Sequence, residues 1–204
     1  MLALALLGAA PPPEVVPLVP GVPVERELAA GESHRYSVDV PAGHFLQVTV
    51  EQRGVDLKLR LLDAAGRELA RRDGPYGLWG AEKLSEVVPE EGLFLLEIFS
   101  APPAAEQPTQ GEYRLDLAAL RPATAANAAI GRAEALFYEA LVAAFERRDL
   151  ATALATWDRA IPLWREAGDA FHEAETWYWS GFAAEAKDQP EEAIRRYRQA
   201  LLYE

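Results

Sequence analysis

Residues 111–132, GEYRLDLAALRPATAANAAIGR, contain the change of pattern that decides the fold. Before Pro122, apolar residues alternate with a period of two, which is typical of strands with one buried face. After Thr124, alanine dominates, glycine and proline become rare, and apolar residues recur at spacings of three and four, which is typical of helices. The chain is therefore expected to hold a β-domain over residues 20–122 and a helical unit over residues 123–204.

The β-domain is expected to contain about eight short strands. Turn signals such as Ala30-Gly31-Glu32, Pro41-Ala42-Gly43 and Asp63-Ala64-Ala65-Gly66 separate the alternating runs. Glycine supplies the positive φ that such turns need, and aspartate accepts local backbone hydrogen bonds. Strands spaced ~10–12 residues apart in this way predict an antiparallel β-sandwich or jelly-roll-like domain.

The helical unit is expected to hold four helices, near residues 127–147, 150–167, 170–187 and 190–203. Asp149 and Asp169 are placed to cap the second and third helices, and Pro190 suits the first turn of the fourth. The pattern Ala153-x3-Trp157-x2-Ala160-Ile161 recurs 40 residues later as Ala193-x3-Tyr197-x2-Ala200-Leu201. Small residues on both sides of a large one are the signature of a tetratricopeptide (TPR) helix pair, so two such pairs are predicted. The alternative is a plain helical hairpin.

Composition limits the function. The 204 residues include 32 acidic and 20 basic side chains, which gives a net charge of −12. No basic stripe is present to replace the counterions of a phosphate backbone, so a nucleic-acid partner is not expected. Cysteine is absent, which removes disulfides, thiolate metal sites and a cysteine nucleophile. No apolar run approaches the ~20 residues that a membrane-spanning helix needs.

The first 19 residues are interpreted as the remnant of an export signal followed by a Pro-rich linker. Residues 2–7 are apolar and residues 8–10 are small, as near a cleavage site, although a positively charged start is absent. Export to the periplasm or the extracellular space is expected on this basis. A disordered Ala/Pro-rich end on a cytoplasmic protein is the alternative.

The whole chain resembles the N-terminal part of bacterial proteins that place a domain similar to the pre-peptidase C-terminal (PPC) domain before tetratricopeptide repeats. The β-domain carries this resemblance in Glu51-Gln52-Arg53-Gly54-Val55-Asp56 and Gly111-Glu112-Tyr113-Arg114-Leu115, and the helical unit carries it in residues 160–169, AIPLWREAGD. Such proteins usually continue into a caspase-like CHAT protease domain, whose His and Cys have no counterpart in these 204 residues. The resemblance implies an exported or envelope-facing interaction protein, and it leaves open an inactive N-terminal fragment of a CHAT-type protease.

No catalytic constellation is found. The chain has no Gly-x-Ser-x-Gly elbow, no His-x3-His pair and no phosphate-binding glycine loop. The protein is therefore expected to be no enzyme, to use no cofactor and to hold no metal site of histidines.

Two sets of residues are candidates for binding. The first is a possible ligand loop of aromatic and acidic side chains, which suit a sugar face or calcium: Asp56, Asp73, Tyr76, Trp79 and Glu82. The alternative is that Trp79 plugs the end of the sandwich while the acids cap turns. The second set is the predicted TPR groove, in which aromatic anchors would bind a peptide or a partner protein: Tyr138, Val142, Phe145, Tyr178, Phe182 and Glu185. The alternative there is internal packing between repeats.

The function expected from these features is that of a non-catalytic scaffold or protein–protein interaction module, with the β-domain as an accessory binding module. The alternative is a calcium- or glycan-binding β-domain on a structural stalk of repeats. Helix 190–203 carries apolar residues on more than one side, so self-association or partner binding through this helix is also predicted.

Overall fold

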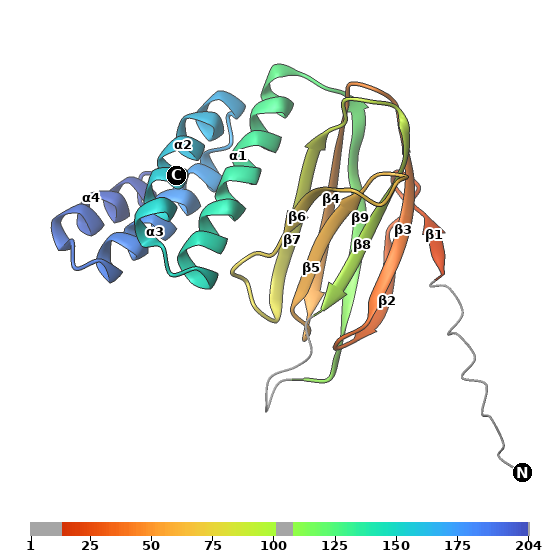
Figure 1. Cartoon of the computed structure of the whole chain (residues 1–204), viewed down its shortest axis with the longest axis horizontal. Coiled ribbons are helices and arrows are strands. Elements are labelled where there is room, and N and C mark those ends of the chain that lie inside the picture. The colour runs from red at the N-terminus through yellow and green to blue at the C-terminus, as the bar shows by residue number, and fades with distance from the viewer. Residues whose placement is uncertain (1–13, 101–107, 204) are drawn as a thin grey trace, which may run out of the picture.

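The structure, a computed structural model, describes residues 14–100 and 108–203. The described residues form a β-sandwich and four α-helices. Figure 1 shows α1 (Ala125–Leu141) next to the sandwich and α4 (Pro190–Ala200) farthest from it. Most of the predicted export segment lies outside the described residues. No helix in the described part is long and apolar enough to cross a membrane.

Within the described residues, the sandwich consists of nine strands in two sheets. The strands are β1 (Val15–Pro17), β2 (Val24–Ala29), β3 (Ser33–Val40), β4 (His44–Arg53), β5 (Leu57–Leu62), β6 (Glu68–Arg72), β7 (Trp79–Val87), β8 (Gly92–Ser100) and β9 (Gln110–Pro122). One sheet has the order β1-β3-β8-β5-β6 and the other β2-β9-β4-β7. All pairs are antiparallel except β1 with β3, as the alternating sequence pattern predicts for most of the domain.

The sandwich begins earlier than the sequence indicates. Val15 pairs with Arg35 in the parallel β1–β3 ladder, and Leu18 is 8% exposed and belongs to the core. The segment predicted as a linker therefore supplies a ninth strand. Three residues without clear alternation are too short for periodicity to identify as a strand.

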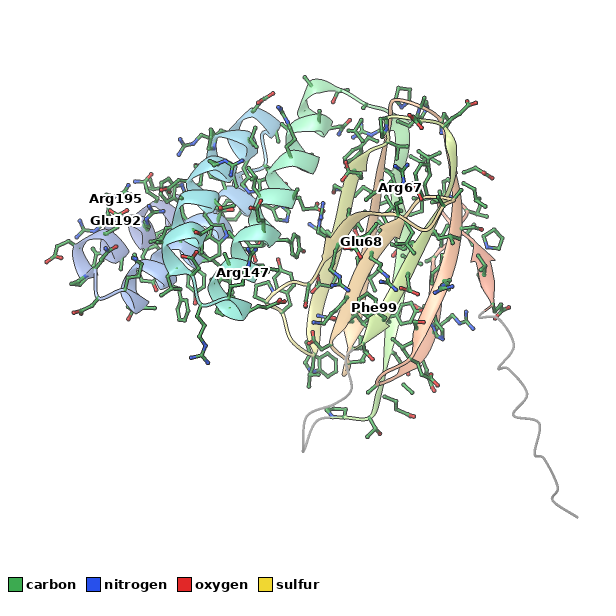
Figure 2. The ribbon with its side chains drawn as sticks, viewed as in Figure 1. Arg67, Glu68, Phe99, Arg147, Glu192 and Arg195 are labelled. Carbon is green, nitrogen blue, oxygen red and sulfur yellow. The ribbon has the colours of Figure 1, made fainter. Side chains whose placement is uncertain are left out.

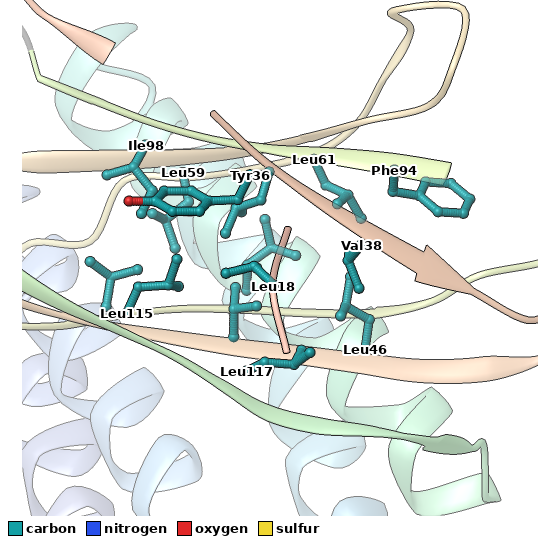
Figure 3. Packing of buried hydrophobic residues seen from close by; sticks show 14 of the residues in the cluster. Leu18, Tyr36, Val38, Leu46, Leu59, Leu61, Phe94, Ile98, Leu115 and Leu117 are labelled. Atoms are coloured by element: carbon teal, nitrogen blue, oxygen red, sulfur yellow. The ribbon is translucent and has the colours of Figure 1, made fainter. Parts of the chain in front are cut away.

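The core lies between the two sheets (Figure 3). Side chains of both inner faces interdigitate there, as Val38 and Leu61 do from one sheet and Leu46 and Leu115 from the other. Each of these four side chains is at most 3% exposed. Burial of this kind, at about 25 cal/mol per Å² of apolar surface, is the main force that holds the sandwich together.

The helices follow the predicted boundaries closely. Beyond α1 come the π-helical turn η1 (Val142–Glu146), α2 (Leu150–Ala167), α3 (Ala170–Ala186) and α4, and each helix packs against the next. Thr124 and Asn127 form a capping box where the sequence pattern changes, and Asp149 and Asp169 cap α2 and α3 as predicted. The first and fourth helices differ from the prediction, because α1 continues as a π-helical turn and α4 ends at Ala200.

The repeated sequence pattern occupies packing positions. Ala153, Trp157 and Ala160 are all fully buried in α2. In the second copy, Tyr197 of α4 lies against Gly181 of α3, where an added Cβ would come within 2.7 Å of the tyrosine ring. Small residues thus allow the close approach of large ones between neighbouring helices.

Candidate functional site

A buried ion pair fastens the helices to the sandwich. The Nε atom of Arg72, on β6, donates to Oε1 of Glu134, on α1, at 2.6 Å, and the two side chains are only 4% and 7% exposed. The backbone N–H of Ser85, on β7, donates to the same carboxylate oxygen at 2.7 Å. One carboxylate on α1 therefore satisfies donors on two strands, which fixes the position of the helix against the sandwich edge.

Glu82 forms a second part of this joint. Its carboxylate is fully buried, accepts from the backbone N–H of Gly74 at 2.9 and 3.0 Å, and lies 3.4 Å from the hydroxyl of Tyr138, which donates to it. Burial raises the pKa of Glu82 to about 8. A side chain on Gly74 would collide with Glu82 and with the ring of Tyr76, so glycine is required for this approach.

Tyr76 reaches from the same loop to the third helix. Its hydroxyl donates to both carboxylate oxygens of Glu175, on α3, at 2.8 and 3.0 Å. Burial raises the pKa of Glu175. Tyr76 and Glu82, which the sequence assigned to a ligand loop, therefore belong to the joint between the two units.

A groove runs along the outside of this joint. It consists of two adjoining hollows of about 550 and 490 Å³. Both hollows are lined by Lys58 and Asp73 from the sandwich and by Val142 and Glu146 from η1. We call the two hollows together the junction groove. The first is bounded further by Phe99 on β8 and by Arg147, which Figure 2 shows on the sandwich and on the helical unit respectively.

The helical wall of the junction groove is a π-helical turn. The N–H of Arg147 donates to the carbonyl of Val142 at 3.1 Å, five residues earlier, instead of four as in an α-helix. The widened turn places Val142, Phe145 and Glu146 on the groove. Single π-helical turns are rare and are found frequently at functional sites.

An exposed row of aromatic rings continues from the second hollow. Phe145 meets Trp179 edge to face, with ring centroids 5.6 Å apart, and stacks on Phe182 at 6.0 Å. Tyr178 lies 5.3 Å from Trp179 and 5.8 Å from Tyr197. We call these five residues the aromatic ridge. Phe145, Phe182 and Tyr178 are 40–50% exposed, so the ridge places several partly exposed aromatic rings side by side.

The structure brings together residues from both predicted sets. Asp56 and Asp73, predicted as ligand residues of the β-domain, line the second hollow opposite Val142 and Phe145, predicted as groove residues of the helices. The two sets were expected on separate units, and they share one groove because α1 lies against the sandwich edge.

The remaining predicted residues have other surroundings. Tyr138 borders the first hollow but is only 8% exposed, because its ring packs beside Arg72 in the joint. Tyr178 and Phe182 belong to the aromatic ridge, and Glu185 accepts a hydrogen bond from the hydroxyl of Tyr197 at 2.8 Å. Trp79 is 66% exposed, so it does not plug the sandwich.

Several residues of the junction groove are not among those selected from the sequence, and they include Lys58, Glu146 and Trp179. Lys58 forms an ion pair with Asp73 across neighbouring parts of the sandwich edge. Glu146 and Trp179 belong to no motif identified in the sequence. Only the spacing of Val142 and Glu146, four residues apart on one helical face, could have indicated that Glu146 belongs with the predicted groove.

The acidic residues of the site are few and partly paired. Asp56 and Asp73 are the acidic residues of the sandwich wall, and Asp73 already pairs with Lys58. No group of three or more His, Cys, Asp or Glu side chains suited to a metal ion occurs within residues 14–100 and 108–203. Calcium takes six to eight oxygen ligands, and the loop considered from the sequence contributes the carboxylates of Asp56, Asp73 and Glu82.

Comparisons with known proteins give structural neighbours alone. No family model matches the chain, and the comparison with curated proteins gives no match. One structural neighbour is the pre-peptidase C-terminal domain of a collagenase from Bacillus anthracis, with 14% identity over 53% of this chain and 98% of that domain and a TM-score of 0.43. Another is Aeromonas hydrophila PliG, a periplasmic inhibitor of g-type lysozyme, with 14% identity over 50% of this chain and 91% of that protein and a TM-score of 0.41.

Proposed function

We propose that this protein is a non-catalytic binding protein that holds an extended segment of a partner protein in the junction groove. The observation that carries the proposal is the convergence of the sandwich edge and the π-helical turn on one groove, with an aromatic ridge at its end. Aromatic side chains bury much area for little conformational entropy and dominate binding energies at interfaces.

The shape of the site favours an extended ligand. The two hollows share four lining residues, and Phe145 and Trp179 of the aromatic ridge line the second hollow. An extended chain could therefore contact both hollows and the ridge. A compact small molecule would fill one hollow and leave the ridge uncovered. A glycan stacked on the ridge is the second candidate, because exposed rings such as Tyr178 and Phe182 suit a sugar face.

We also propose that the helical unit consists of two tetratricopeptide-type helix pairs. Support comes from the sequential packing of the four helices and from the close contact of Gly181 with Tyr197. We further propose that the protein is exported and that it is related to the N-terminal part of CHAT-domain proteins, on the sequence motifs given above.

Selection of displayed random peptides tests the function. Peptides enriched on the native protein are expected to bind at least tenfold more weakly to the Phe145→Ala variant, because Phe145 connects the second hollow with the ridge. The matched control is Trp79→Ala, which removes an exposed aromatic side chain outside the groove. Equal loss in both variants, or no enrichment of any peptide, would refute a binding role for the groove.

A further inference from the structure

The second hollow of the junction groove combines an aromatic corner with carboxylates. The rings of Phe145 and Trp179 meet at 88°, and Asp56, Asp73 and Glu146 line the same hollow. Its one basic lining residue, Lys58, is held by Asp73 in an ion pair. Three negative charges and one positive charge therefore surround a space whose wall is an aromatic surface.

Asp56 has unused capacity to accept hydrogen bonds. Its Oδ1 atom is buried and has no hydrogen-bond partner in the described part of the chain. Burial, followed by the charge of Asp73, raises the pKa of this carboxyl, against the smaller opposing effect of Lys58. A donor that is also a cation would supply both the missing hydrogen bond and a compensating positive charge.

We propose that the second hollow binds the cationic side chain, lysine or arginine, of the partner segment. The cation would contact the faces of Phe145 and Trp179 and pair with Asp56 and Glu146. This inference rests on the proposed function and names the chemistry of its anchor residue.

Two other occupants fit the hollow less well. An anionic group would face three carboxylates, with the one ammonium already paired. A hard metal ion would need more oxygen ligands than the described residues gather, and aromatic rings do not supply them. Ammonium and guanidinium groups, by contrast, are attracted both to ring faces and to carboxylates.

The test uses four peptides that differ at one position. Each is an acetylated and amidated decapeptide of alternating leucine and serine with lysine, arginine, norleucine or citrulline at the centre, and binding is measured by fluorescence anisotropy. Lysine and arginine peptides are expected to bind about tenfold more tightly than their neutral counterparts at low salt, in line with a desolvated cation–aromatic contact beside a carboxylate. The advantage should shrink in moderate salt.

Variants assign the effect to the hollow. Asp56→Asn and Glu146→Gln should each reduce the advantage of the lysine peptide over the norleucine peptide at least threefold. Glu191→Gln, an exposed carboxylate at the start of α4, should leave it unchanged. Glu146 is exposed, so its variant tests the inference even where Asp56→Asn impairs folding.

The outcomes separate the inference from the proposed function. Equal binding of lysine and norleucine peptides, with both lost in Phe145→Ala, would refute the cation site and leave the peptide groove standing. An advantage for lysine that persists in both carboxylate variants would also refute it. Absence of binding by all four peptides and by every selected peptide would refute both.

Discussion

Replacing Glu134 with alanine removes the carboxylate that joins α1 to two strands of the sandwich. Arg72 would then remain buried at the sandwich edge, with the carbonyl of Arg71, 2.8 Å from its Nη1 atom, as its other hydrogen-bond partner in the described part of the chain. The N–H of Ser85 would lose its acceptor as well. Breaking a buried ion pair by removing one partner typically costs about 3–5 kcal/mol of unfolding free energy, and we expect a loss in this range.

Urea denaturation followed by circular dichroism and tryptophan fluorescence measures the loss. Glu139→Ala is the matched control, because Glu139 is exposed on the same helix, and its replacement should change stability by less than about 0.5 kcal/mol. The double variant Arg72→Met with Glu134→Leu removes both charges and fills the space, so it should be more stable than Glu134→Ala. A cost for Glu134→Ala below about 1 kcal/mol, or a double variant as unstable as the single one, would refute this account of the joint.

Three further predictions concern pH, helix packing and association. The pKa of Glu82 in the folded protein is about 8, above its ordinary value of 4.5, so the native protein should lose stability as pH rises between these values. The loss from this group is at most about 1.4 kcal/mol per pH unit. Urea titrations at pH 5, 6.5 and 8 measure it, and Glu82→Gln should remove it. Gly181→Ala should lower stability by about 1–3 kcal/mol, because its Cβ would meet the ring of Tyr197 at 2.7 Å, and Tyr197→Val should relieve the clash in a double-mutant cycle. Ile194 and Leu202 are 51% and 71% exposed, so replacing both with glutamate should lower the mass measured by light scattering. A native protein that is already a monomer at high concentration would show that this end of the molecule does not mediate self-association.

Local pattern was enough to predict the elements and several of their ends. The change of period at residues 120–124 coincides with the end of β9 and the capping box of α1, because both signals arise within a few residues of chain. Trp157 was placed in the helical core from its small neighbours, and it is fully buried. Strand β1 was missed, because its pairing with β3 depends on a distant segment.

The site itself depends on contacts that local pattern does not contain. Arg72 and Glu134 are 62 residues apart, and no spacing rule connects a strand end with a helix face. Tyr138 has the spacing of a groove residue, yet it is buried because the face of α1 that carries it turns toward the sandwich. Asp56 and Phe145 were both selected by residue type, and only the packing of α1 brings them to one hollow.

The most direct test of the central claim, that the junction groove binds a partner segment, is nuclear magnetic resonance mapping of a bound peptide. The ¹⁵N-labelled protein would be titrated with a selected peptide that carries a lysine. Amide signals of Lys58 and Asp73 on the sandwich wall and of Val142 and Glu146 on the helical wall should shift together along one saturating curve. Shifts confined to the edge strands β1 and β2 or to α4, with the four groove amides unmoved, would contradict the account.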